Sequence, residues 1–317
     1  MEAQGDDEIF VYMGGDQEVP EHVRRTRIYK SVKIVRARAF QRRIYLISVD
    51  FHDGIEIIEE GAFHGCSLLS GSIKLLGIRI IKAEAFSNCH RLTDVEFGDK
   101  LETIEQRAFF NCYSLRNAII PSVRSIGKMA FCCCDALTDL DLPEGLETVE
   151  EGAFCNCDRL RHISLPLKGD MIAVNVFVTC PNFTSVDLVG GIHRTVASLH
   201  LESWKNEMKG EITRINQVLP EAGAWTKTAV IQEWMRAVSR QINHYKAEHK
   251  KILKESTTLL ELALWKAKID ENAEKESVEE TKAKRLKPDT QGERRTQRIT
   301  SGANIVFKNV LPFLELK

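Results

Sequence analysis

The chain has 317 residues, of which 43% are hydrophobic and 28% are charged, and its formal net charge is −1. This length is enough for about two domains, and the near-neutral charge gives no global reason to expect a nucleic acid or an anionic membrane as partner. No apolar run approaches the length of a transmembrane helix. The acidic start, Met1–Glu8, lacks the basic region and the apolar core of a secretory signal. We therefore expect neither a membrane span nor a signal peptide.

Residues 1–31 have the pattern of a terminal cap. The apolar run Ile9–Tyr12 is followed by the turn residues Gly14 and Gly15, and Val23–Tyr29 can form a second strand. Because the residues that follow are repetitive, the chain needs a segment that covers the open end of the repeats. We expect residues 1–31 to form a hairpin-like N-terminal cap. A separate recognition module is the alternative.

From Val32 to about residue 190 the chain repeats one motif, Ala-Phe-x-x-Cys, with degenerate copies at both ends. Its phenylalanine returns at an almost constant interval. The phenylalanines are Phe40, Phe63, Phe86, Phe109, Phe131, Phe154 and Phe177. A fixed period of this size is typical of a solenoid, in which each repeat buries its apolar side only against its neighbours.

Each repeat also carries aliphatic residues in fixed positions. One lies five residues before the phenylalanine, as at Ile104, and a leucine lies three residues after the cysteine, as at Leu115. A segment that alternates apolar and polar residues follows, with Val95 and Phe97 as its inward residues in one repeat. Alternation of this kind predicts a short strand with one buried face.

The full phrase reads Leu-x-x-Ile/Val-x-x-x-Ala-Phe-x-x-Cys-x-x-Leu-x-x-Ile-x-Leu-Pro, as in Leu146–Pro166. It resembles the leucine-rich repeats of type 5, also called BspA-like, over about residues 32–190. The resemblance implies an α+β fold, a right-handed curved solenoid of about seven repeats of roughly 22–23 residues each. Each repeat would give one short strand on the concave side, a second on the convex side and a helical turn carrying Ala-Phe.

All nine cysteines lie in the repeat region, and six of them share one position of the repeat. An odd number with this spacing is unlike a secreted disulfide framework, so we expect reduced thiols in an intracellular protein. Disulfides between adjacent repeats are geometrically possible, and Cys132, Cys133 and Cys155 are candidates for a thiolate metal site. Because no Cys-x-x-Cys pair repeats with zinc spacing, we expect no metal and no other cofactor.

The pattern changes near Gly190–Gly191. Apolar residues three or four apart over Leu201–Leu219, and again over Trp234–Ile252, predict amphipathic helices. Thr258–Glu261 has the form of a capping box that opens or re-registers a further helix. We expect an all-helical region over 191–270, packed on the end of the solenoid. A helical interface for a second copy or a partner is the alternative.

The stretch Glu255–Asp270, together with Trp225 and Trp234, is similar to a group of diatom repeat proteins. These proteins join an Ala-Phe-x-x-Cys solenoid to a helical region of this kind. The resemblance implies the domain order and assigns no activity to any residue.

Residues 271–298 are charged and poor in apolar side chains, so we expect a disordered linker. Within it, Lys282–Pro288 resembles a short basic nuclear-localisation signal, which leaves a nuclear location open beside a cytoplasmic one. The segment 299–317 becomes apolar again at Ile305–Leu316. We expect this segment to dock back on the chain as a terminal strand, and capture by another protein is the alternative.

The sequence contains no Gly-x-Gly-x-x-Gly, phosphate-loop, His-Glu-x-x-His or Gly-x-Ser-x-Gly pattern. His64, His90 and His162 lie near cysteines in the sequence, but a Cys–His pair needs a third group that orients it. Stacked repeats do not obviously supply such a group. We therefore expect no enzyme and no catalytic residues.

Polar residues alternate with the buried ones along each concave strand and must point outward. Acidic residues dominate the twelve outward positions that the pattern identifies, and none of these is lysine or arginine. Curved solenoids commonly bind proteins on such surfaces, and an acidic surface favours a basic partner. The predicted protein-binding residues are Asp50, Asp94, Glu96, Asn117, Ile119, Asp139, Asp141, His162, Ser164 and Asp187. A face that serves only solubility is the alternative, and calcium ranks lower because the Asn117/Ile119 pair separates the acidic pairs.

Two functions follow from these patterns. The first is a non-enzymatic scaffold that binds an unidentified protein segment on the acidic face. The charge of the face favours a basic segment. Neither a nucleic acid nor a membrane is expected as partner. The second is a structural or regulatory protein that acts through its helical region and C-terminal peptide, where a homo-oligomer could form.

Overall fold

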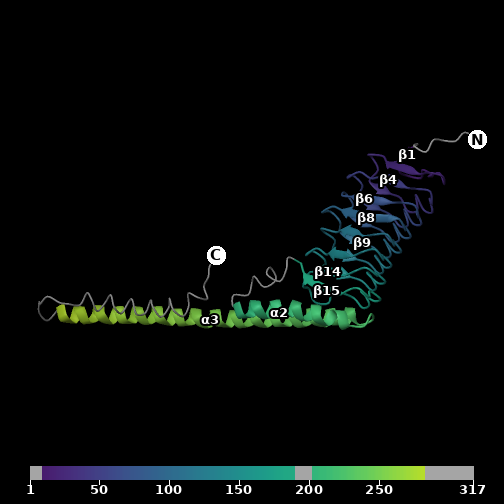
Figure 1. Ribbon diagram of the computed structural model, residues 1–317. Helices are drawn as coiled ribbons and strands as arrows, with labels where there is room; N and C mark the ends of the chain where they lie inside the picture. Colours follow the sequence, from purple (N-terminus) through teal and green to yellow (C-terminus); the bar gives the residue numbers. More distant parts are fainter. Residues whose placement is uncertain (1–8, 190–201, 283–317) are drawn as a thin grey trace, which may run out of the picture. The chain divides into compact units, whose positions relative to one another are not determined.

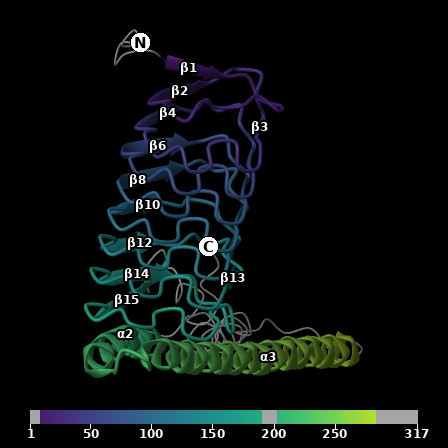
Figure 2. The same cartoon turned by 90° about the vertical axis from the view of Figure 1, so that its right-hand side faces the viewer.

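The computed structural model describes residues 9–189 and 202–282, with side chains through residue 272. The described residues divide into two compact units, 9–189 with 205–241 and 202–204 with 242–282. The first unit contains a solenoid of about seven turns, in which short strands form two ladders (Figures 1 and 2). Within the described ranges, no helix is both long and apolar enough to cross a membrane.

The longer ladder is built from nine short parallel strands. They form hydrogen bonds in three groups, β1-β2-β4, β6-β8-β10 and β12-β14-β15, and β4 contacts β6 as β10 contacts β12. The strands are β1 (Ile9–Tyr12), β2 (Arg25–Ile28), β4 (Ser48–Asp50), β6 (Gly71–Leu75), β8 (Leu92–Phe97), β10 (Asn117–Ile119), β12 (Asp139–Asp141), β14 (His162–Leu165) and β15 (Ser185–Leu188).

The second ladder is a single sheet of six two-residue parallel strands, in a column apart from the first (Figure 2). An isolated bridge between Val149 and Ile172 adds one more turn to it. The strands are β3 (Ile34–Val35), β5 (Ile57–Ile58), β7 (Ile80–Ile81), β9 (Thr103–Ile104), β11 (Ser125–Ile126) and β13 (Thr148–Val149).

The N-terminal segment differs from the predicted hairpin. β1 pairs with β2 in parallel, with Tyr12 opposite Ile28, and β2 pairs with β4 in parallel as well. A parallel partner requires the chain to cross back before it forms the next strand, so this segment is the first part of the ladder and not an antiparallel hairpin. Its Tyr12 is fully buried and covers the end of the core.

The core contains a column of seven stacked phenylalanine rings. From Phe40 to Phe177, adjacent ring centroids are 4.8–6.0 Å apart and the rings are nearly parallel. Tyr12 meets Phe40 edge-on at 5.1 Å, and Phe183 meets Phe177 at 4.8 Å. Aromatic pairs contribute about 0.5–1.5 kcal/mol each beyond their burial. The recurring phenylalanine of the sequence is therefore one continuous column in the structure.

Each repeated cysteine ties its turn to the preceding one. The thiol of Cys66 donates to the carbonyl oxygen of Phe40 at 3.1 Å, and the same bond recurs at every step as far as Cys180 and Phe154. Burial raises the pKa of the Cys66 thiol to about 12, so this thiol keeps the proton that the bond requires. The position therefore needs a small buried side chain that can donate, and alanine would fill the space without the donor.

One pair of cysteines departs from the expected reduced state. Cys132 and Cys155 directly follow the phenylalanines of adjacent turns and form a disulfide. Stacking in register brings their Cα atoms to 4.6 Å, within the range that a disulfide spans. The prediction of reduced thiols is wrong for this pair, and the other seven cysteines are free.

We predict that protein denatured without reductant and then alkylated carries seven labels, matching the free cysteines. After reduction it should carry nine, the full cysteine count, because a disulfide sulfur does not react with the alkylating agent. Mass spectrometry counts the labels, and the double variant Cys132→Ser/Cys155→Ser should give the same count in both treatments. Nine labels without reduction would show that the bond is absent in solution.

Two positions in every turn have a left-handed backbone. One lies two residues before the phenylalanine and the other two residues after it, and φ is between 53° and 73° at all fourteen. Half of these residues are glycine or asparagine, which tolerate this conformation. Thr179, at φ 56°, is the least suited because its Cβ is branched.

We predict that Thr179→Asn raises the free energy of unfolding by about 1 kcal/mol, since asparagine removes most of this backbone strain. Urea denaturation measures the change. The reciprocal variant Asn175→Thr, at the other left-handed position of the same turn, should lower stability by a similar amount. Equal stabilities for all three proteins would contradict the strain.

Charges alternate in sign along one row of the second ladder's turns. The row consists of Lys33, Glu56, Arg79, Glu102, Arg124 and Glu147. Successive members pair two by two at 3.2, 2.9 and 3.3 Å. The next position, Asp170, breaks the alternation, and Arg236 of the helical region supplies its cation at 3.1 Å. Each exposed pair contributes only about 1 kcal/mol or less, but the alternation favours the in-register stack because that register places opposite charges beside each other.

The helices are α2 (Glu202–Val218), the short 3-10 helix η1 (Leu219–Glu221) and α3 (Lys227–Lys282). In the first unit their side chains complete the last turn of the solenoid. The Asn216 amide accepts from the N–H of Val186 at 2.8 Å and donates to its carbonyl at 3.1 Å, as a further strand would. Gln232 donates in the same way to the carbonyls of Ile172 and Ala173. The helices therefore cover an edge that would otherwise leave backbone groups unpaired.

Lys227 makes three of these contacts. Its Nζ donates to the carbonyl oxygens of Cys180, Pro181 and Phe183 at 3.0, 3.1 and 2.6 Å. The residue is 2% exposed, and this burial lowers the pKa of Lys227. The three carbonyls replace the water that the ammonium loses.

We predict that Lys227→Met lowers the free energy of unfolding by about 3 kcal/mol, because it leaves buried carbonyls without a donor. Denaturant titration measures the loss. The matched control is Lys246→Met, which removes an exposed lysine from the same helix and should change stability by less than about 0.5 kcal/mol. A small effect at Lys227 would show that the end of the solenoid does not depend on this contact.

α3 runs without a break from Lys227 to Lys282, which corrects two predictions. Thr258 does not open a new helix, and its Oγ1 donates to the carbonyl of Lys254 at 2.9 Å inside α3. Residues 271–282 are helical although a linker is predicted there, since their glutamates, lysines and alanines are good helix formers. The rest of the predicted linker, most of the basic motif and the segment 299–317 lie outside the described residues.

Candidate protein-binding face

The strands of the longer ladder bury every second side chain and point the others outward. We call the outward residues of β2 to β15 the ladder face. They are Arg25, Arg27, Ser48, Asp50, Ser72, Lys74, Asp94, Glu96, Asn117, Ile119, Asp139, Asp141, His162, Ser164, Ser185 and Asp187. All ten predicted binding residues are among them.

The register brings most of these ten residues into rows across the strands. Asn117 lies beside Asp94 and Ile119 beside Glu96, and Asp141, Ser164 and Asp187 follow one another on β12, β14 and β15. The breaks in hydrogen bonding before β6 and before β12 separate three groups of strands. Asp50 therefore belongs to a different group from the other predicted residues.

The face also carries three cations that the sequence pattern missed. Arg27 pairs with Asp50 at 3.3 Å, and Lys74 pairs with Glu96 at 3.0 Å, while Arg25 lies beside Ser48 in the register. The twelve outward positions of the sequence pattern omit these cations for two reasons. The pattern assigns residues 25–28 to the cap, and the second repeat has a register shift between Gly71 and Ser72. The spacing held a usable signal, since Arg25 and Arg27 precede Ser48 and Asp50 by one repeat length.

Three of the four remaining acidic residues of the face, Asp139, Asp141 and Asp187, lie at one end of it. We call them the acidic end. Among the described residues, no ion pair joins any of these three carboxylates to a lysine or arginine. The acidic end is therefore the part of the face with uncompensated negative charge.

Asp94 lies between the paired region and the acidic end. Hydrogen bonds from Thr93 and Asn117 lower the pKa of its carboxyl group, so it stays ionised. Ile119, on the strand between them, is 58% exposed. An apolar side chain therefore lies among acidic neighbours at the centre of the face.

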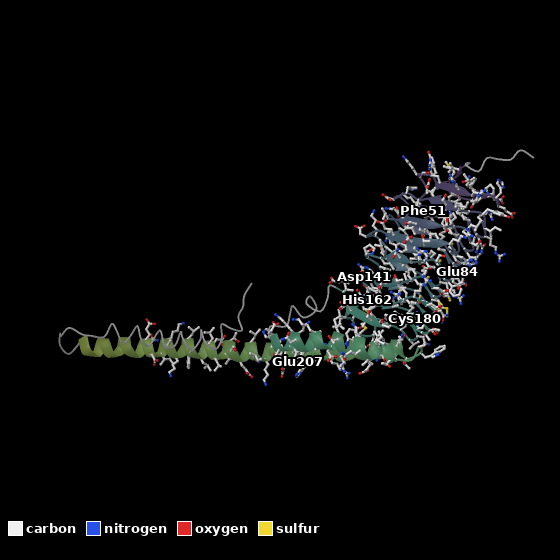
Figure 3. The ribbon with its side chains drawn as sticks, in the orientation of Figure 1. Phe51, Glu84, Asp141, His162, Cys180 and Glu207 are labelled. Carbon is white, nitrogen blue, oxygen red and sulfur yellow. A yellow bond between two sulfur atoms is a disulfide. The ribbon has the colours of Figure 1, made fainter. Side chains whose placement is uncertain are left out.

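A chain of polar contacts crosses the acidic end and includes Asp141 and His162 (Figure 3). Ser164 Oγ donates to Asp141 Oδ1 at 2.5 Å and lies 3.4 Å from Nε2 of His162. The other ring nitrogen of His162, Nδ1, is 3.0 Å from Ser185 Oγ. In a Ser-His-Asp triad the carboxylate orients the histidine, whereas here the carboxylate accepts from the serine. The contacts hold these side chains in place on an open surface and do not form a Ser-His-Asp triad.

The described part of the chain contains no group of three or more histidine, cysteine, aspartate or glutamate side chains placed to hold a metal ion.

Comparison with known families identifies the repeat. The family model described as "BspA type Leucine rich repeat region (6 copies)" matches residues 22–123 and 79–196. Together the matches span more than half of the chain. The chain belongs to the BspA-type leucine-rich repeat family.

Solved structures with a similar leucine-rich repeat come from bacteria. The T. pallidum leucine-rich repeat protein is 24% identical, with 53% of this chain and 77% of that chain covered and a TM-score of 0.35. A leucine-rich repeat protein from Eubacterium ventriosum is 22% identical over 56% of this chain and 44% of that one, with a TM-score of 0.43. One from Bacteroides ovatus is 20% identical over 52% and 55%, with a TM-score of 0.33. No curated protein sequence matches the chain.

BspA-type leucine-rich repeat proteins are generally protein-interaction scaffolds and typically not enzymes. This family property agrees with a long ladder that presents polar side chains in rows. It does not select the face or the partner of this leucine-rich repeat protein.

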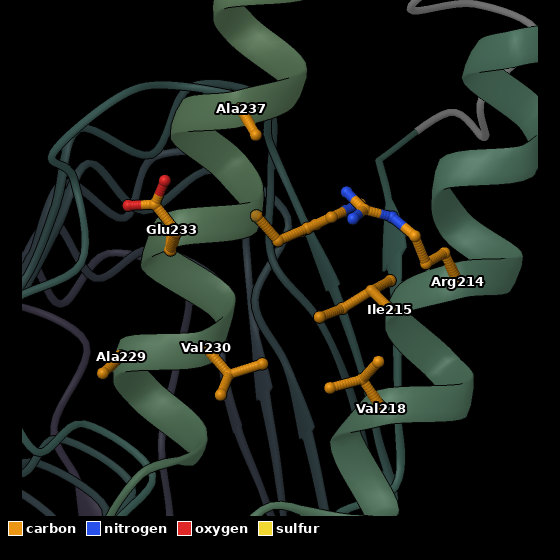
Figure 4. Close-up of a pocket in the computed structure, with 8 residues that line it drawn as sticks. Arg214, Ile215, Val218, Ala229, Val230, Glu233 and Ala237 are labelled. Atoms are coloured by element: carbon orange, nitrogen blue, oxygen red, sulfur yellow. The ribbon is translucent and has the colours of Figure 1, made fainter.

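A second surface of this leucine-rich repeat protein lies between α2 and α3 in the first unit. A groove of about 500 Å³ there is lined by apolar side chains that include Ile215, Val218 and Val230, together with Arg214 and Glu233 (Figure 4). Val218 is 48% exposed. An apolar groove between two helices can accommodate a helix or an extended peptide.

Proposed function

We propose that this protein is a non-enzymatic scaffold whose ladder face binds a basic protein segment. The observation that carries the proposal is the distribution of ion pairs. Asp50 and Glu96 each form an ion pair with a cation of the face, whereas within the described residues no lysine or arginine pairs with Asp139, Asp141 or Asp187. Uncompensated charge of this kind speeds the encounter with a basic partner and favours it over an acidic one.

The arrangement also indicates what a suitable segment contains. Neighbouring strands lie about 4.8 Å apart, so the acidic end spans about 10 Å across β12, β14 and β15. A guanidinium group can donate to two carboxylate oxygens at once through its fixed fork, which favours arginine there. The exposed Ile119 adds an apolar contact, so the preferred segment carries an apolar residue next to its basic ones.

We predict that the triple variant Asp139→Asn/Asp141→Asn/Asp187→Asn binds basic peptides about tenfold more weakly, since each exposed charge pair contributes roughly 0.2–1 kcal/mol. The probes are peptides selected from a random displayed library on the unmodified protein. Isothermal titration at two salt concentrations measures affinity. The salt dependence should shrink with the affinity because three charges are gone.

The control for this experiment is Asp50→Asn/Glu96→Gln. These carboxylates already have a cation beside them, so the affinity should change less than threefold. Circular dichroism confirms that both variants fold. Equal peptide binding by the unmodified protein and the triple variant would refute the proposed role of the acidic end.

The groove between α2 and α3 supports a second candidate function, assembly through the helical region. Its apolar lining suits another protein's helix or a second copy of this chain. This function requires Val218 and its neighbours and no carboxylate of the ladder face. Substitutions at the acidic end would therefore leave it intact.

We also propose an intracellular location, with a nuclear site open through the basic Lys282–Pro288. Seven free cysteines support it, because a secreted repeat protein would seldom retain so many thiols. The Cys132–Cys155 bond argues in the opposite direction. Alkylation inside intact cells, followed by the label count described above, distinguishes a protein whose cysteines are all reduced from one that carries the Cys132–Cys155 disulfide.

A further inference from the structure

The second unit carries a row of exposed apolar side chains on α3. Leu259, Leu262, Trp265 and Ile269 are 63%, 56%, 67% and 49% exposed. At about 100° per residue they fall within an arc of about 120° around the helix. They form one stripe about 15 Å long, which we call the distal patch.

The patch contrasts with the earlier part of the same unit. There Trp204 of α2 stacks on Tyr245 of α3 with ring centroids 4.8 Å apart, and Ile242 and Tyr245 are 5% and 6% exposed. No comparable contact covers the distal patch among the described residues. A contiguous apolar stripe of this kind marks a site that another segment covers.

A second copy of α3 fits the patch poorly. The positions at coiled-coil spacing through it are Glu255, Thr258, Leu262, Trp265, Ile269 and Asn272. Only the middle three are apolar, whereas a stable coiled coil needs about three to four heptads of apolar seam. The patch is the size of a short segment and not of a long helical partner.

The chain itself contains a segment of suitable chemistry. Residues 283–304 have few apolar side chains, but eight of the twelve residues of Ile305–Leu316 are isoleucine, valine, leucine or phenylalanine. Pro312 prevents this segment from forming one continuous helix. It can instead lie along the stripe with alternate side chains against it.

The length of the connection matches the distance to be covered. The patch is centred about 18 residues before Lys282, where α3 ends, and about 18 helical residues span about 27 Å. Residues 283–304 form the connection, and a coil of that length has a root-mean-square span of about 25 Å. An intramolecular contact is strongest when these two lengths agree.

We propose that residues 305–316 bind the distal patch of the same chain. Phe307 and Phe313 supply the largest apolar side chains of the segment, and Trp265 is the largest side chain of the patch. The contact buries two apolar stretches that would otherwise both face water. It is independent of the ladder face and of its partner.

Trp265 reports on this contact directly. Trp204 and Trp234 are buried, and Trp225 is 74% exposed, so the variant Trp225→Phe leaves Trp265 as the one tryptophan that is accessible without the contact. In this background we predict that Phe307→Ser/Phe313→Ser increases acrylamide quenching of the fluorescence about twofold. The control Lys308→Ser changes the same segment without removing an apolar group, and it should quench like the parent.

Three further measurements decide the interpretation. Adding Trp265→Phe should abolish the difference, which assigns it to the patch. The protection should persist on tenfold dilution, because an intramolecular contact does not depend on concentration. Equal quenching of the parent and the serine variant would overturn the proposal. Loss of the protection on dilution, together with a dimer seen by light scattering, would also overturn it, since a second copy would then cover the patch.

Discussion

Equivalent residues one repeat apart stack directly on one another in every turn, and the main features of the structure follow from this stacking. The phenylalanine column places each ring on the previous one, and the cysteine thiols join successive turns through the phenylalanine carbonyls. Both series continue across the step from Phe109 to Phe131, although that step is one residue shorter than the others. The left-handed backbone at two positions of every turn serves the same end, because it closes the turn within the available length.

Register of this kind explains features that have no local cause. Opposite charges meet along the second ladder only because each turn places its residue beside the equivalent one, and the same geometry brings Cys132 to Cys155. It also generates the ladder face, in which Asp141, Ser164 and Asp187 form a row although each is a full repeat away from the next in the chain. A binding surface on a solenoid is therefore a property of the stack and not of any single repeat.

A stack without a natural end must be closed, and the two ends of this one are closed differently. Tyr12 covers the aromatic column at the start. At the other end, side chains of α2 and α3 make the contacts that a further turn would make. Asn216 hydrogen-bonds the backbone of the last strand, and Gln232 hydrogen-bonds the last turn of the second ladder. Arg236 pairs with the last acidic residue of the charge row, and Lys227 donates to three carbonyl oxygens. This part of the helical region is thus a structural requirement of the repeat, whereas the distal patch belongs to the second unit, where we propose that residues 305–316 cover it.

The repeat, its period, the inward residues and the family could all be predicted from the amino-acid sequence, because they depend on local alternation and on spacing that can be counted. The sequence also located the outward residues of most strands. It did not reveal that β2 and Lys74 belong to the ladder face, that Cys132 meets Cys155, or that Lys227 is buried against three carbonyls. Each of these depends on which residues, a repeat or more apart in the sequence, become neighbours once the turns are stacked. The same reason separates the acidic residues that are paired from those that are not: the charges could be read from the chain, but their partners could be assigned only after the turns were in register.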